Sequence, residues 1–268
     1  MDYAVVILVS GLAAGLTLFS GFGLGSLLLP AFAVFFPVEV AVAATAVVHL
    51  ANNMFKLALV GRDADQRVVV RFGVPALIGA IAGAVVLVMI GDLGVIARYG
   101  LWGKACAVTP VKLVVGLMVA GFAVFDFLPI AKKWAFGEKH LPVGGALSGF
   151  FGGLSGHQGA LRSVFLVKAG LDKRAYVGTA SVCSALVDVA RLVVYFVPLA
   201  VVGGAFGKDF AAGMTRDAIG LVIAGCVAAF AGSFVGARLL KKVTLEGVHV
   251  IVGVMLVVVG LAMAVGVI

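Results

Sequence analysis

The stretch FSGFGLGSLLLPAF, residues 19–32, places three alternate glycines and then a proline inside an apolar run that extends from residue 3 to residue 38. As one continuous helix this run would be roughly 54 Å long, at about 1.5 Å per residue. That is too long for one crossing of a hydrocarbon core about 30 Å thick and too short for two crossings. The run therefore predicts two half-helices that meet at Gly21, Gly23 and Gly25.

The whole chain has the composition of an integral membrane protein. Of its 268 residues, 63% are hydrophobic and only 12% are charged. Long uncharged runs recur at 72–90, 218–237 and 247–268, each close to the roughly 20 residues that a membrane-spanning helix needs. We attribute the net charge of +8 to basic cytoplasmic loops rather than to nucleic-acid binding. The cysteines form no Cys-x-x-Cys pair, so neither a disulfide framework nor a thiolate metal site is predicted.

A second copy of the broken segment follows half a chain later, in FGGLSGHQGALRS at 151–163. A shift of 134 residues overlays the sequence on itself without a gap. The matched pairs include Gly11 with Gly145, Gly15 with Gly149, Gly25 with Gly159, and Thr45 with Thr179. Internal duplication is the usual construction of secondary transporters. The sequence therefore predicts one transmembrane domain, 1–268, built from a repeat 1–128, a basic linker 129–140 and a repeat 141–268.

Each repeat reads as a broken element followed by three helices, which gives about eight hydrophobic segments. They are expected at 3–38, about 40–61, 68–90, about 107–126, 141–167, 175–198, 218–237 and 247–268. Broken elements that enter the bilayer and return would make the repeats inverted, whereas elements that cross it would make them parallel. Only the inverted arrangement, with the N-terminus outside, collects the basic loops on the inner side. We therefore expect an all-α polytopic protein of the inner or plasma membrane, with two inverted repeats, each a re-entrant element plus three transmembrane helices.

The two breaks are predicted to hold a substrate. A break in a membrane helix is tolerated only where it is buried in protein or lines a wet cavity. A half-helix that begins near Ser26 would direct its free N–H groups and positive dipole end at the midplane, which favours an anion. The second copy, at Gly159, would do the same from the other side. The alternative is that these glycines serve only close helix packing.

The glycine-rich segments and the residues that follow them resemble those of a known family. Paired glycine-rich segments are each followed about 20 residues later by Ala-x-x-x-Thr, from Ala41 to Thr45 and from Ala175 to Thr179. This pattern is similar to that of the TauE/SafE sulfite exporters, also called the toluene-sulfonate uptake permeases, over essentially the whole chain. The resemblance implies a small membrane carrier of sulfite, sulfonates or related anions, and not an enzyme. The chain departs from the family's run of adjacent glycines by inserting His157, Gln158 and Arg162.

Polar side chains within the predicted spans supply further candidate ligands, because intramembrane ionisable groups are costly and usually functional. On the helix 40–61, Thr45, His49, Asn52 and Lys56 share one face, with Asn53 beside them. On the helix 175–198 the similar stripe is Ser181, Ser184, Asp188 and Arg191. The complete predicted substrate site comprises Gly21, Gly23, Gly25, Ser26, Thr45, His49, Asn52, Asn53, Ser155, Gly156, His157, Gln158, Gly159, Arg162, Thr179, Asp188 and Arg191.

Several of these roles have an alternative. Asp188 and Arg191, one turn apart, form either part of the site or a structural bridge. Arg162 suits an oxyanion through its fork of donors, or it extends to the membrane interface, as we expect of Lys56 near its helix end. His49 and His157 are open as carriers of a coupling proton.

The predicted function is a secondary carrier that exports a small oxyanion, sulfite or an organosulfonate, by alternating access around the midplane breaks. We expect no cofactor, metal or catalytic residue, and no GxxxxGKS/T motif for ATP is present. The partners are the anion and the lipid bilayer, and a coupling proton and a homodimer stay open. One alternative is a cation or metal carrier, which needs clustered carboxylates, histidines or thiolates. Another is a rhomboid-like intramembrane serine protease, since Ser155 and His249 resemble its pair, although their long separation argues against it.

Overall fold

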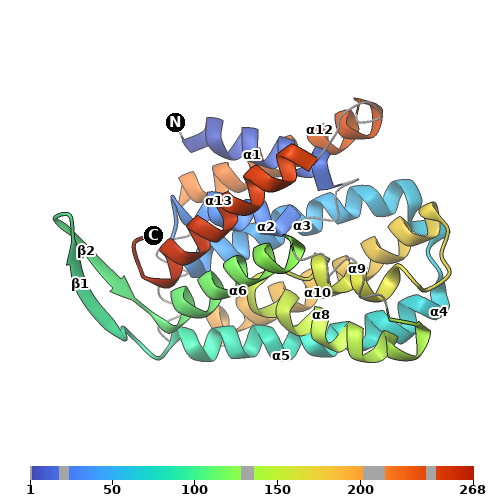
Figure 1. Cartoon of the computed structure of the whole chain (residues 1–268), viewed down its shortest axis with the longest axis horizontal. Helices are drawn as coiled ribbons and strands as arrows, with labels where there is room; N and C mark the ends of the chain where they lie inside the picture. Colours follow the sequence, from blue (N-terminus) through green and yellow to red (C-terminus); the bar gives the residue numbers. More distant parts are fainter. Residues whose placement is uncertain (1, 18–23, 128–135, 202–214, 240–245) are drawn as a thin grey trace.

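The computed structural model describes residues 2–17, 24–127, 136–201, 215–239 and 246–268. The first half contains α1 (Asp2–Thr17), α2 (Leu24–Ala33), α3 (Val38–Val60), η1 (Gly61–Asp63), α4 (Gln66–Val68), η2 (Val69–Gly73), α5 (Val74–Gly91), β1 (Ala97–Leu101), β2 (Lys104–Val108) and α6 (Pro110–Phe127). The second half contains η3 (Glu138–His140), α8 (Leu141–Ser155), α9 (Gly159–Leu166), α10 (Lys173–Val201), α12 (Arg216–Leu239) and α13 (Glu246–Ala264). The long helices run roughly along the long axis of the molecule, and both termini lie towards the same end (Figure 1).

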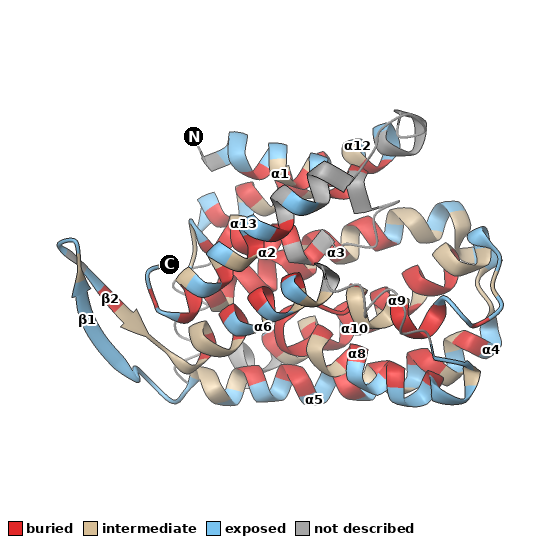
Figure 2. Cartoon of the chain, in the orientation of Figure 1, coloured by how far each residue is buried: buried red, intermediate tan, exposed pale blue. Residues whose placement is uncertain are grey.

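The predicted class, a helical polytopic membrane protein, is confirmed in its coarse form. Four helical segments are long and apolar enough to cross a membrane: Val38–Asp63, Gln66–Gly91, Lys173–Phe196 and Arg216–Val235. Shorter apolar helices cover Tyr3–Gly15, Pro110–Phe125 and Gly253–Ala264. The buried residues lie between the helices, while large apolar side chains such as Leu8, Ile78 and Val227 face outward (Figure 2). An apolar outer surface suits a helix bundle whose solvent is lipid.

Local chemistry sets several helix starts. Asp65 caps α4, because its carboxylate accepts the N–H of Val68 at 2.9 Å. Asp172 likewise accepts the N–H of Ala175 at 2.8 Å in the first turn of α10. Proline stands within the first two positions of α8, where its N–H would have no intrahelical acceptor.

Glycines bring α5 and α8 into backbone contact. A Cβ atom at Gly149 would overlap the carbonyl oxygen of Ala76, and one at Gly153 would overlap that of Ala80. From the other side, a Cβ atom at Gly83 would overlap the carbonyl oxygen of Phe150. Helices in membranes associate through such small-residue faces. Close packing, the alternative use of the glycines, therefore holds for these positions within α8.

The second predicted break is present at the junction of α8 and α9. Gly156 ends α8 with a left-handed φ of 81°, and its N–H donates to Gly152 O at 2.9 Å. From there α9 folds back along α8: Ser148 Oγ donates to Gln158 O at 3.0 Å, and Gly144 lies against the ring of Phe165. α8 and α9 thus form an antiparallel helical hairpin.

The first predicted break falls mostly outside the described residues, since Gly21 and Gly23 belong to the segment 18–23. α1 ends at Thr17 and α2 begins at Leu24, and the two helices are in contact. The chain therefore does divide the run 3–38 into two helices. The side chain of Ser26 is not described, although its backbone lies in the first turn of α2.

The sequence analysis missed a β-hairpin between α5 and α6. β1 and β2 pair antiparallel, from Ala97 opposite Val108 to Leu101 opposite Lys104. The turn residues Trp102 and Gly103 both have positive φ, 49° and 77°, as a two-residue hairpin turn requires. The hairpin projects from the end of the molecule that holds the termini (Figure 1). Because β2 extends to residue 108, α6 begins at Pro110 rather than near 107.

The α5–α8 contact predicts that one added methyl group destabilises the protein. Gly149→Ala should lower the free energy of unfolding by about 1–3 kcal/mol, because the new Cβ forces the two backbones apart. The matched control is Gly121→Ala on α6, where no atom lies within 4 Å of the new Cβ. Thermal unfolding of the purified protein in detergent should show a lower midpoint for the first variant alone, and equal midpoints would contradict this packing.

Candidate functional site

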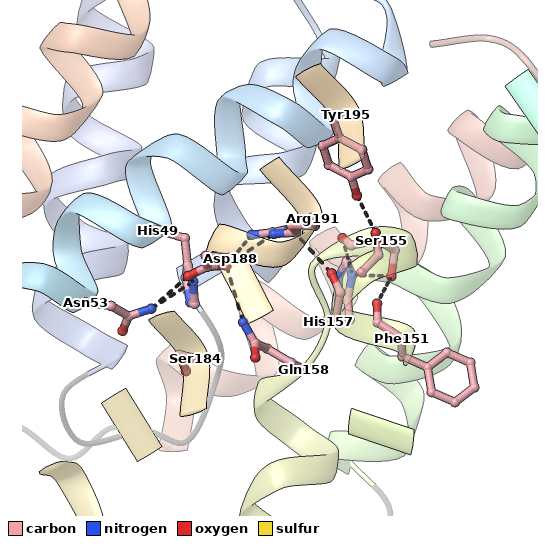
Figure 3. A network of polar contacts seen from close by, with 12 residues as sticks. His49, Asn53, Phe151, Ser155, His157, Gln158, Ser184, Asp188, Arg191 and Tyr195 are labelled. Carbon is pink, nitrogen blue, oxygen red and sulfur yellow. Dashed lines mark hydrogen bonds and ion pairs between the residues drawn. The ribbon is translucent and has the colours of Figure 1, made fainter. Parts of the chain in front are cut away.

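The centre of the candidate site is the carboxylate of Asp188 on α10, which is completely buried. Its Oδ1 accepts hydrogen bonds from Arg191 Nε at 3.1 Å, Arg191 Nη2 at 2.7 Å and Gln158 Nε2 at 3.4 Å. Its Oδ2 accepts from Asn53 Nδ2 at 2.9 Å and lies 2.6 Å from His49 Nδ1 (Figure 3). A carboxylate with this many donors stays ionised and is charge-balanced by Arg191.

The hydrogen bonds define the state of His49. An ionised carboxylate only accepts, so His49 Nδ1 must carry the hydrogen that is directed at Asp188. In the neutral imidazole, Nε2 is then the acceptor nitrogen. Because His49 and Asn53 lie on α3 and Asp188 on α10, this contact links the two halves of the chain.

Arg191 lies directly against the helix break. Its side chain is fully buried, and Nη1 donates to Gly152 O over a long 3.5 Å. A Cβ atom at Gly156 would lie 2.8 Å from the same Nη1. Glycine is therefore required at position 156 for two reasons: the backbone has a left-handed φ, and the guanidinium occupies the space of a side chain.

The two glycine-rich segments meet at this point. A Cβ atom at Gly25 would lie 3.0 Å from Gly156 O and 3.7 Å from Thr45 Cγ2. The first turn of α2, the α8–α9 junction and α3 therefore converge beside Arg191. The sequence analysis expected the half-helices that begin near Ser26 and Gly159 to point at one place, and Gly156 lies three residues before Gly159.

Buried polar atoms without a partner border the same place. Thr45 Oγ1 and His157 Nε2 make no hydrogen bond within the described part of the chain. His157 Nδ1 lies 3.1 Å from Ser155 O, and its ring stacks on Phe122 with centroids 5.8 Å apart. Buried polar atoms normally have partners, because desolvation without a hydrogen bond costs about 1–3 kcal/mol. Thr45 lies close to Gly25, and His157 directly follows Gly156, so both unpartnered atoms belong to residues beside the break.

The remaining predicted residues make contacts in different parts of the bundle. Arg162 donates to Ser184 Oγ, one helical turn from Asp188. Asn52 accepts from Ser233 Oγ at 2.6 Å, and its Nδ2 is unpaired among the described residues. Thr179 is not brought into the cluster, because its hydroxyl accepts the N–H of Asp65 at 2.9 Å near one end of the bundle. Gly159 begins α9.

Two residues of the site were missed in the sequence. Tyr195 is completely buried and donates its hydroxyl hydrogen to Gly153 O. It follows Arg191 by four residues, so the polar stripe of α10 could have been extended to it. Ser233 pairs with Asn52 from the middle of an uncharged run, and no pattern in the sequence marks it.

The same geometry bears on the two alternative functions, a metal carrier and a serine protease. The described residues contain no group of three or more His, Cys, Asp or Glu side chains suited to a metal ion. Ser155 Oγ donates to Phe151 O at 3.1 Å, while the side chain of His249 lies outside the described set. The polar centre is thus a single carboxylate balanced by an arginine and surrounded by hydrogen-bond donors.

The Asp188–Arg191 pair leads to a stability prediction. Asp188→Asn should cost about 3–5 kcal/mol of unfolding free energy, because it leaves the guanidinium charge buried without a counterion. The double variant with Arg191→Gln should be more stable than Asp188→Asn alone, because the unpaired charge is gone. Thermal unfolding of the four members of this cycle measures the coupling, and strictly additive effects would contradict a direct pair.

No curated protein and no solved structure matches the chain. The family model described as the sulfite exporter TauE/SafE matches residues 4–263, in agreement with the resemblance seen in the sequence. Because this match covers nearly the whole sequence, the chain belongs to the TauE/SafE sulfite exporter family of membrane transporters.

Proposed function

We propose that this protein is a secondary transporter that moves a small oxyanion, sulfite or an organosulfonate, out of the cell by alternating access. The observation that carries the proposal is the convergence of Gly25 and Gly156 beside the guanidinium of Arg191. Two helix N-termini and the remaining donor group of a guanidinium at one place form an environment for an anion. The family to which the chain belongs gives the sulfur oxyanions as the substrate class.

The donors suit such a substrate. The first-turn N–H groups of α2 and α9 have no intrahelical partners, and both helices begin at the break region. Arg191 Nη1 has only the long contact with Gly152 O, so it retains capacity for an anion oxygen. Thr45 Oγ1 adds an unpartnered hydroxyl. Few water molecules compete in this buried place, which strengthens each of these interactions.

The helix contacts support two related repeats. α1 packs on α12 and α8 packs on α5, while α3 contacts α10 and α6 contacts α13. If each element of one half is exchanged for its counterpart in the other, this set of contacts maps onto itself. The antiparallel α8–α9 hairpin supports a re-entrant element. Two such repeats that rock about the midplane would expose the breaks to each side in turn.

The charge distribution supports an inner face at one end of the bundle. Arg67 and Arg71 both approach Glu138, at 3.0 and 3.7 Å, and Arg174 lies 3.1 Å from Asp63. The basic loops of both halves are therefore neighbours, as the positive-inside rule requires of cytoplasmic loops. The proposal includes a coupling proton on His49 or His157 and a homodimer.

The proposal is tested by transport in proteoliposomes. The purified protein should release loaded ³⁵S-sulfite faster than protein-free vesicles, with sulfoacetate, thiosulfate and taurine as comparison substrates and with or without a pH gradient. Failure to accelerate the release of any of these anions would overturn the proposal.

Gly156→Ala should abolish most of this transport, because the new Cβ would lie 2.8 Å from Arg191 Nη1 at a left-handed φ. The matched control is Gly170→Ala, which has a φ of 70° but no atom within 4 Å of the new Cβ. Both alanines carry similar backbone strain, so a loss confined to position 156 reports the site. Transport at the wild-type rate in Gly156→Ala would exclude the break as the binding place.

A further inference from the structure

Two cations inside the bundle have no carboxylate partner among the described residues. Lys56 on α3 and Arg162 on α9 are both partly buried. Asn53 on α3 contacts Asp188 on α10, and both cations lie one turn from that contact: Lys56 follows Asn53 by three residues, and Arg162 donates to Ser184, four residues before Asp188. Arg162 donates to the neutral hydroxyl of Ser184. Across the described ranges, no ion pair joins either cation to an acid. Asp188, the acid that Asn53 contacts one turn before Lys56, is already held by Arg191 and His49.

Such an arrangement is unfavourable unless an anion completes it. Two like charges repel, and partial burial weakens the screening that water would provide. A buried cation has a large desolvation energy unless a counter-charge accompanies it. A bound anion between Lys56 and Arg162 would offset both their mutual repulsion and their desolvation.

Lys56 and Arg162 lie between the end of the bundle that carries the basic loops and the Asp188 cluster. Ser184 precedes Asp188 by one turn, roughly 6 Å along α10 at about 1.5 Å per residue. Thr179 lies roughly 7.5 Å further towards the end, where it binds the N–H of Asp65. Lys56 precedes the end of α3 at Val60 by four residues. The two cations are therefore located between the loop that contains Asp65 and the helix break.

We propose that Lys56, Arg162 and the Ser184 hydroxyl form a second anion site, at which a sulfur oxyanion binds before it reaches the central break. This step rests on the proposed function, because it presupposes an anionic substrate. The arginine fork can hold two oxygens and the lysine a third. Ser184 Oγ accepts from Arg162, so its own hydrogen is available for the ligand.

The charge of the site also selects among sulfur compounds. Sulfite, thiosulfate and sulfoacetate carry only negative groups, and both cations attract them. Taurine carries an ammonium group as well, and two neighbouring cations repel it. The site therefore favours anions without a positive group over zwitterions that have the same sulfonate.

The experiment measures initial rates of ³⁵S-sulfite transport with substrate presented at either face of oriented proteoliposomes. Lys56→Gln should raise KM roughly 3–10-fold at the face that carries the basic loops, with kcat changed less than twofold. The increase should shrink as salt screens the remaining charge. Lys56→Arg should stay within twofold of wild type. The control is Lys112→Gln, a partly buried lysine at the opposite end of the bundle, which should leave KM unchanged.

A stability measurement separates binding from a structural role. Without ligand, Lys56→Gln should melt at the wild-type temperature or above it, because a repulsion is removed. Sulfite should then raise the melting temperature of the variant less than that of the wild type. Arg162→Lys, which keeps the charge but loses the fork, should show an intermediate KM.

The outcomes distinguish the two proposals. If wild-type protein moves no anion, the proposed function fails. If it transports sulfite but Lys56→Gln has the wild-type KM at both faces, the second site is overturned and the transporter remains. A variant that melts below the wild type without ligand would also overturn the second site, because Lys56 would then be a structural residue.

Discussion

The structure depends on one buried negative charge. An ionised carboxylate in an apolar interior is tolerated only when donors replace the water that it has lost. Asp188 obtains them from α3 through His49 and Asn53, from the helix break through Gln158, and from its own helix through Arg191. Because these donors belong to different elements, the hydration requirement of one side chain holds the break, α3 and α10 in register.

Glycine has two separate uses in this chain, and the sequence alone does not distinguish them. Gly149 and Gly153 let α5 and α8 touch, which needs only a missing side chain. Gly156 needs in addition a backbone conformation that other residues avoid, with a guanidinium beside it. Both uses look alike in a glycine-rich stretch. Only the neighbour across the helix, Ala76 in one case and Arg191 in the other, decides which applies.

The helices were predictable because the thickness of a bilayer sets how long an apolar run must be, whereas the hairpin depends on two positive φ values at Trp102 and Gly103. The polar stripes correctly placed His49, Asn53, Asp188 and Arg191 in the interior, because helical periodicity fixes the face of a residue. Helical periodicity does not show which residue of a neighbouring helix or loop each of these side chains contacts. Thr179 lies on α10 roughly 13 Å from Asp188, where a loop amide occupies its hydroxyl.

The two halves of the chain carry different charged residues. At the positions related by the 134-residue shift, His49 corresponds to Cys183, and Asp188 corresponds to Met54. The first half therefore supplies the imidazole and the second half supplies the carboxylate, so their contact crosses between the halves. In the proposed mechanism, an oxyanion at the break binds Nη1 of Arg191 while Nε and Nη2 stay on Asp188, so the ligand and the carboxylate share one guanidinium. A ligand can shift a conformational equilibrium only through contacts that differ between the two states, and a shared guanidinium provides such a difference.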